Sequence, residues 1–168
     1  TDTIAKNPGC WMAHNNLGMA LTGERRFDEA VDEYRRSVEI NPQNAEGWCN
    51  WGAILSFSGR WDEAMDLYRR ALAANPNYSL AHYNLGVVLD VRGVTKGAIT
   101  AYRAATRADP LYPKAFHNLG AALSNTGDYG GAVEALTQAT RLDPKLAISH
   151  YCLGITRGNM GDPDGAIA

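Results

Sequence analysis

The sequence predicts an all-α protein made of stacked helical repeats, because three kinds of residue recur in phase. Glycine, alanine and proline each return every 34 residues along the 168-residue chain. The positions are Gly18, Gly52, Gly86, Gly120 and Gly154; Ala30, Ala64, Ala98, Ala132 and Ala166; Pro8, Pro42, Pro76, Pro110 and Pro144. A fixed period of this size is typical of solenoids, in which each repeat packs on its neighbours. Such solenoids usually bind partners rather than catalyse reactions.

The period also sets the expected boundaries of the repeats. With positions counted from 1 to 34, four full repeats cover 11–44, 45–78, 79–112 and 113–146. Residues 147–168 begin a truncated fifth repeat, and residues 1–10 match the end of a preceding one. We therefore expect a single solenoid over 1–168. Because both ends fall inside a repeat, we expect a piece of a longer protein, or ends that stack head to tail on another copy.

Each repeat is expected to form two helices. In the second repeat, apolar residues at helical spacing give one stripe from Trp48 to Leu55, and a second stripe runs from Trp61 to Leu72. Gly59 separates the two stripes. Pro76 ends the second helix, because proline cannot continue a helix. The same reasoning applies in order to each of the other repeats.

Residue sizes predict how the two helices of a repeat pack. Glycine at position 8 and alanine at position 20 allow close approach, and bulky residues fill the space opposite them, as native packing density requires. Position 24 is the main bulky position, occupied by Tyr34, Tyr68, Tyr102 and Leu136.

These residues make the chain similar to the tetratricopeptide repeat family over essentially its whole length. The resemblance rests on the aromatic-Leu-Gly first helix, the alanine and aromatic second helix and the closing proline. It implies a right-handed superhelical solenoid of helix-turn-helix repeats, whose first helices line a concave groove. The sequence departs from the family pattern at Arg25, where the turn glycine is expected, and at Thr95 and Arg157.

In this family, position 6 of the first helix faces the groove. Here it holds a run of asparagines: Asn16, Asn50, Asn84 and Asn118. A carboxamide offers donors and an acceptor that match a peptide backbone. With repeats stacked roughly 10 Å apart, the ladder would hold about nine residues of extended peptide. It is similar to the asparagine ladder in the repeat domain of O-linked N-acetylglucosamine transferase. Asparagine at this position can instead have a purely structural role, in which it forms hydrogen bonds with polar groups between repeats. The spacing alone does not distinguish peptide binding from this structural role.

Other groove positions are expected to tune selectivity. They carry a mixture of apolar and polar side chains with little positive charge, so a basic clamp for a terminal carboxylate is not predicted. The residues proposed for this role are Asn15, Cys49, Tyr83, His117, Phe57 and Asp90. The histidines at position 4, His14, His82 and His150, are expected to pack rather than to bind metal, because two repeats separate each from the next.

Composition narrows the class of function. The formal net charge is −2, which does not suit a protein that neutralises many phosphates, so nucleic acid is not an expected partner. No apolar run reaches the roughly 20 residues that span a bilayer, so no membrane contact is expected. Three scattered cysteines predict free thiols, and a soluble, cytoplasmic chain is favoured. No phosphate loop, zinc motif or nucleophile elbow is found, so no cofactor and no enzymatic activity are expected.

The sequence thus predicts a scaffold that binds an extended segment of a partner protein. Two alternatives remain open. The chain could be the substrate-recruiting repeat domain of a larger, glycosyltransferase-like enzyme, or a structural module that assembles head to tail through its ends.

Overall fold

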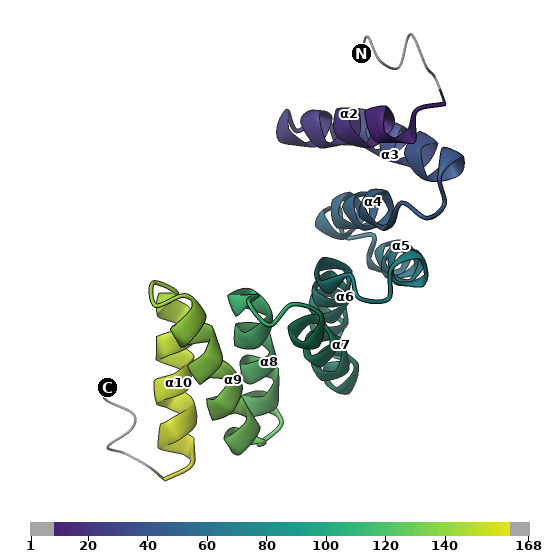
Figure 1. Cartoon of the computed structure of the whole chain (residues 1–168). Helices are drawn as coiled ribbons and strands as arrows, with labels where there is room; N and C mark the ends of the chain where they lie inside the picture. The colour runs from purple at the N-terminus through teal and green to yellow at the C-terminus, as the bar shows by residue number, and fades with distance from the viewer. Residues whose placement is uncertain (1–8, 162–168) are drawn as a thin grey trace. The chain divides into compact units, whose positions relative to one another are not determined.

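The computed structural model describes residues 9–161, and all of the regular structure in this range is helical. Predictions that concern the chain ends, including the head-to-tail contact through 1–8 and 162–168, lie outside the described residues. The helices are α2 (Trp11–Gly23), α3 (Phe27–Ile40), α4 (Ala45–Phe57), α5 (Trp61–Ala74), α6 (Ser79–Val91), α7 (Thr95–Ala108), α8 (Pro113–Asn125), α9 (Tyr129–Leu142) and α10 (Ala147–Asn159). The expected all-α repeat fold is confirmed (Figure 1).

The helices form two compact units, Thr1–Leu85 and Gly86–Ala168, and α6 crosses the boundary between them. In the first unit α2 packs on α3, α3 on α4 and α4 on α5. In the second unit α7 packs on α8, α8 on α9 and α9 on α10, and α8 also contacts α10. Each unit is therefore a stack in which a helix contacts its neighbours in sequence, as expected of a solenoid. The exact division into repeats stays a prediction.

A close contact between glycine and a large side chain holds the two helices of each repeat together. A methyl group added to Gly18, Gly52 or Gly86 would lie 2.7, 2.8 or 2.6 Å from the ring of Tyr34, Tyr68 or Tyr102. At Gly120 the opposing side chain is Leu136, at 2.6 Å. These three tyrosines and Leu136 are fully buried, as are the alanines at position 20 from Ala30 to Ala132. Only glycine leaves room for the ring at position 8, so this contact sets the spacing between the two helices.

The turn that follows each first helix depends on a residue with positive φ. Four of these residues are glycines, Gly59, Gly93, Gly127 and Gly161, with φ between 74° and 83°. The fifth is Arg25, with φ 61°, and it is the only non-glycine residue in this conformation in the range 9–161. The left-handed region is unfavourable for a side chain with a Cβ, so the sequence departure at Arg25 carries a local strain.

A second recurring contact ties a first helix to the end of the preceding repeat. The ring nitrogen of the residue at position 4 donates to a proline carbonyl six residues earlier: Trp48 to Pro42 (2.9 Å), His82 to Pro76 (2.8 Å) and His150 to Pro144 (3.1 Å). Because the acceptor is a carbonyl oxygen, the donating hydrogen of each histidine is on Nε2. His14 differs, since its Nδ1 lies 2.6 Å from the buried Glu33 carboxylate of α3.

Replacing Arg25 by glycine should stabilise the protein by about 0.5–1 kcal/mol. Glycine removes the steric penalty of positive φ, and the higher conformational entropy of glycine in the unfolded chain offsets part of that gain. Thermal or urea denaturation monitored by circular dichroism would measure this change. The matched control is Gly59→Ala, which places a Cβ at the same turn position and should destabilise by a similar amount. An unchanged midpoint for both variants would contradict the strain assigned to the turn.

Replacing Gly52 by alanine should destabilise the protein by about 1–3 kcal/mol, because the new methyl group overlaps the Tyr68 ring. The control is Gly130→Ala in α9, where a Cβ meets no atom within 4 Å. That substitution should be neutral or stabilise by up to about 1 kcal/mol, by lowering the entropy of the unfolded chain. Equal effects at the two glycines would show that helix propensity, and not the ring contact, decides the outcome.

Candidate functional site

The first helices of the first unit present two asparagine side chains that face outward. Asn16 of α2 is exposed and Asn50 of α4 is half-buried. Among the described residues, neither carboxamide makes a hydrogen bond to another group. Each therefore keeps two N–H donors and a carbonyl acceptor for water or for a ligand.

Exposed apolar side chains accompany these asparagines on the same helices. Met12 and Met19 stand at i−4 and i+3 from Asn16, and their exposed fractions are 54% and 47%. Phe57 follows Asn50 by two turns and is 72% exposed. Residues at these spacings share one face of a helix. We name this surface, made of Met12, Asn16, Met19, Asn50 and Phe57, the asparagine face.

Phe57 is exposed but not isolated. Its ring lies 5.5 Å from that of Phe27 at the start of α3, with the planes tilted by 50°. This is the tilted geometry that aromatic pairs prefer. The contact fixes one edge of the Phe57 ring and leaves most of its surface open to a ligand.

Asn84 is partly engaged inside the protein. Its Nδ2 donates to the buried Cys49 thiol at 3.5 Å, which joins α6 to α4. Burial raises the pKa of Cys49 to about 12, although the bond from Asn84 acts in the opposite direction. The asparagine thus has a structural role between repeats, and it keeps its carbonyl oxygen and one N–H.

Two of the expected site residues in the second unit are also engaged within it. Asn118 donates to the hydroxyl of buried Tyr102 at 3.4 Å. His117 is half-buried, and its Nδ1 lies 3.0 Å from Ser149 Oγ of α10. Burial lowers the pKa of His117. Asp90, near the end of α6, is exposed, and Tyr83 of the first unit is half-buried.

Asn15 belongs to a buried polar network. Its side chain is 3% exposed, and its Oδ1 accepts from Nδ2 of Asn44 at 3.3 Å. Asn44 also donates to Ser37 Oγ at 2.9 Å and accepts from the backbone N–H of Gly47 at 3.1 Å, so it caps α4. Ser37 in turn donates to the Trp11 carbonyl at 2.8 Å. The network joins α2, α3 and α4 through satisfied buried groups.

These positions correct one part of the sequence interpretation. The family pattern predicts that position 5 of the first helix faces a ligand, but Asn15 and Cys49 are buried and His117 is half-buried. Each of the three bonds to a residue at or just before the next first helix: Asn44, Asn84 and Ser149. Position 5 therefore mainly joins successive repeats. Burial leaves Asn15 and Cys49 no surface for a ligand, and Asn44, which the repeat pattern does not single out, organises the contact at α2.

The described part of the chain contains no cluster of three or more potential metal ligands. Its cysteines at positions 10, 49 and 152 are free thiols, and only Cys49 is buried. Within the same range, no helix has the length and apolar character needed to cross a membrane.

The stacked helix pairs, the glycine contacts and the outward-facing first helices define a helical repeat protein of the kind that forms protein interaction modules. Family models for the tetratricopeptide repeat match residues 11–44, 50–113, and both 33–66 and 101–134, and a model described as TPR repeat matches 125–161. The chain is built of tetratricopeptide repeats. No curated protein sequence matches it.

Solved structures share this fold at low sequence identity. "YrrB: a TPR protein with an unusual peptide-binding site" has a TM-score of 0.83 at 23% identity, covering 99% of this chain and 86% of that one. PilF of Pseudomonas aeruginosa has a TM-score of 0.87 at 21% identity, covering 97% and 74%. MamA of Desulfovibrio magneticus RS-1 has a TM-score of 0.79 at 23% identity, covering 93% and 88%. These matches support the fold, and they give no specific support to a relationship with O-linked N-acetylglucosamine transferase.

Replacing Asn44 by alanine should destabilise the protein by about 1–3 kcal/mol, because it removes a helix cap and leaves Asn15 and Ser37 with fewer partners in a buried site. Asn44→Asp keeps the acceptor for Gly47 but puts a second carboxylate oxygen against Asn15 Oδ1, so it should also destabilise at neutral pH. Chemical denaturation measures both effects. Exposed Asn77→Ala is the control and should stay within about 0.5 kcal/mol of the parent. Parent-like stability of the aspartate variant would exclude the assigned donor role of Asn44.

Proposed function

We propose that this chain is a protein interaction module that binds an extended peptide segment of a partner through its asparagine face. Asn16 and Asn50 contact the peptide backbone, and Met12, Met19 and Phe57 contact its side chains. Asn84 adds to the clamp with the polar atoms that remain after its contact to Cys49, and Asn118 is the fourth position of the ladder. Tyr83, His117 and Asp90 tune selectivity.

The observation that carries this proposal is the unequal use of the four asparagines. Asn84 and Asn118 donate to other groups of the protein. Asn16 and Asn50 make no such bond in the part of the chain that the structure describes, although both have the same position in their repeats. A purely structural role would give every asparagine a partner, so the two open carboxamides favour binding to an external backbone.

The surroundings of the asparagines suit an extended peptide. Backbone hydrogen bonds would hold the chain in place regardless of its sequence, and the exposed methionines and Phe57 would add apolar contacts to alternate side chains. Methionine is flexible and adapts to side chains of different shape. The solved structure of YrrB is described as having an unusual peptide-binding site, which supports a peptide ligand for a protein of this fold.

The test compares peptide binding by the parent and by an Asn16→Ala, Asn50→Ala double variant. A peptide array identifies bound sequences, and fluorescence anisotropy with the strongest peptide then gives Kd. Each lost backbone hydrogen bond contributes about 0.5–1.5 kcal/mol, so the double variant should bind roughly 5- to 100-fold more weakly.

The matched control is Asn77→Ala, which removes an exposed asparagine from a loop and should leave Kd unchanged. Circular dichroism and the unfolding midpoint establish that the double variant is folded. Equal affinity of the folded double variant and the parent would refute the clamp.

A further inference from the structure

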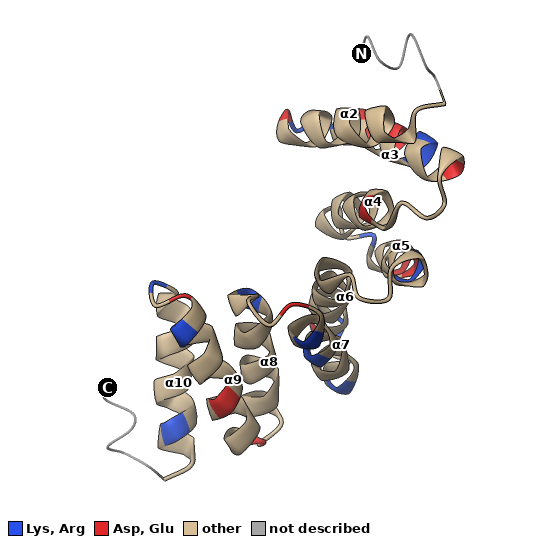
Figure 2. Cartoon of the chain, viewed as in Figure 1, with Lys and Arg blue, Asp and Glu red and all other residues tan. Residues whose placement is uncertain are grey.

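The second helices carry one exposed stripe whose charge differs between repeats. Positions 18, 22, 25 and 29 share a face, because they are spaced by four, three and four residues. On α3 the stripe is Asp28, Asp32, Arg35 and Glu39, and on α5 it is Asp62, Asp66, Arg69 and Ala73. On α7 it is Lys96, Thr100, Arg103 and Arg107, all exposed. This α7 stripe has three cations and no acid, and Figure 2 shows no red on α7.

On α7, threonine replaces the aspartate of position 22, so Arg103 at position 25 lacks the partner that the equivalent arginines of α3 and α5 have. Arg35 pairs with Asp32 at 3.3 Å and Arg69 pairs with Asp66 at 2.8 Å, each three residues earlier on the same helix. On α7 the equivalent residue is Thr100, whose hydroxyl donates to the Lys96 carbonyl at 3.0 Å. Over residues 9–161, no ion pair involves Lys96, Arg103 or Arg107.

The charge at the start of the stripe does not serve the stability of α7. The first turn of α7 has no acidic residue, whereas α3 and α5 each begin with two. Lys96 places a positive charge in that first turn, where the helix dipole favours a negative one. Arg107, in the last turn, suits the dipole, so it is the charge of Lys96 that points to a role outside the helix.

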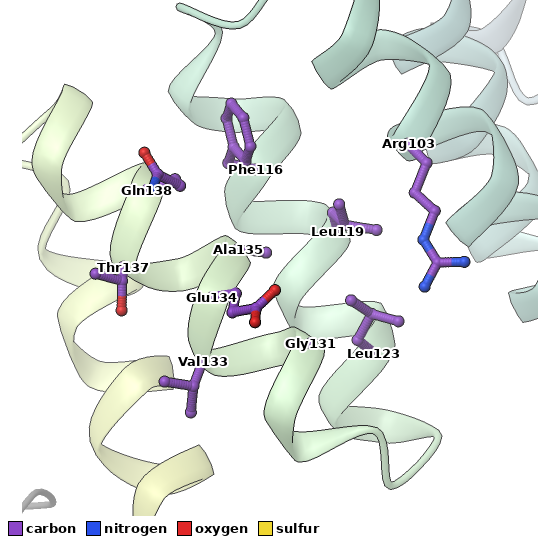
Figure 3. Close-up of a pocket in the computed structure, with 10 residues that line it drawn as sticks. All are labelled: Arg103, Phe116, Leu119, Leu123, Gly131, Val133, Glu134, Ala135, Thr137 and Gln138. Carbon is purple, nitrogen blue, oxygen red and sulfur yellow. The ribbon is translucent and has the colours of Figure 1, made fainter.

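The α7 stripe borders an apolar groove within the same unit. The groove has a volume of about 520 Å³, and Arg103 forms its edge on α7. Phe116, Leu119 and Leu123 of α8 supply its apolar surface, and Glu134 and Gln138 of α9 line the opposite side (Figure 3). Gly131 on α9 has no side chain to fill the space. Glu134 makes no ion pair with any described residue.

Side chains of the first unit already fill and pair with much of its equivalent groove. Trp48 and Trp51 of α4 are stacked there, with ring centroids 5.9 Å apart. Arg70 lies 5.1 Å from the centre of the Trp48 ring, and Arg35 lies 5.8 Å from that of Trp51. Two of the three acidic residues that line it, Glu63 and Asp66, are paired with Arg60 and Arg69. The third, Glu39, makes no ion pair with a described residue. Internal pairs thus engage most of the charges around the first unit's groove, whereas Arg103 and Glu134 at the second groove make no ion pair with a described residue.

We propose that the groove between α7 and α9 and the α7 stripe together dock an acidic segment of a partner protein that carries one large apolar side chain. The apolar side chain enters the groove over Leu119 and Leu123. Carboxylates of the segment pair with Arg103, Arg107 and Lys96, and Arg103 can bind a carboxylate through two N–H groups. Glu134 repels carboxylates on the opposite side and so orients the segment along α7. This surface is formed by α7, α8 and α9, and it shares no residue with the asparagine face.

The test uses a labelled peptide in which one leucine is flanked on both sides by glutamates, with binding followed by fluorescence anisotropy. The informative variant is Thr100→Asp, which rebuilds on α7 the pair that α3 and α5 possess and so occupies Arg103. It should weaken binding about three- to fivefold, the size expected for an exposed charge contact. Arg103→Ala combined with Arg107→Ala should weaken it about tenfold, and affinity should fall as salt rises.

Matched control variants show whether binding depends on this surface. Arg69→Ala on α5, whose arginine already has a partner, should leave Kd unchanged, as should the Asn16→Ala, Asn50→Ala variant. A peptide with alanine in place of leucine should bind at least about tenfold more weakly, because the groove loses its apolar contact. No binding of the peptide to the parent, equal binding by folded Thr100→Asp, equal binding of a lysine-flanked peptide, or tighter binding of a single-stranded oligonucleotide would each overturn the proposal.

Discussion

The contact between a glycine on the first helix and a large side chain on the second determines the rest of the architecture. Because a methyl group at Gly18, Gly52 or Gly86 would overlap a tyrosine ring, the two helices of a repeat have one separation only. The same contact recurs in each of these repeats, so residues at equal positions share a helix-pair environment even where their side-chain partners differ. Function can then arise from single exchanges at one position of the repeat, as at position 22.

Much of the fold follows from the sequence because the same local signals occur several times. The glycine at position 8, the bulky residue at position 24 and the closing proline each recur in phase, and the helices begin and end near these signals. The sequence also shows that Arg25 stands where the turn glycine is expected. In the structure Arg25 has the positive φ of the turn glycines. Repetition makes such local signals reliable, because a chance match to the pattern in one repeat would not recur at the same position in the next.

The surroundings of individual site residues are less predictable. The family pattern assigns position 5 to the binding surface, yet Asn15 and Cys49 are buried by contacts to the next repeat. Burial there depends on a residue more than 25 positions away, such as Asn44 for Asn15, and helical periodicity within one repeat does not contain that information. By contrast, a comparison of equal positions in the sequence shows that Arg103 lacks the aspartate partner found in other repeats. The groove beside Arg103 is visible only in the structure.

The reactivity of the buried Cys49 thiol can be used to measure local opening of this solenoid. Only a thiolate reacts readily with alkylating reagents, and burial between α4 and α6 both excludes the reagent and raises the pKa to about 12. Modification therefore requires that the packing around Cys49 opens locally. The rate of alkylation, compared with that of the more accessible Cys10 and Cys152, would give the frequency with which this packing opens without global unfolding.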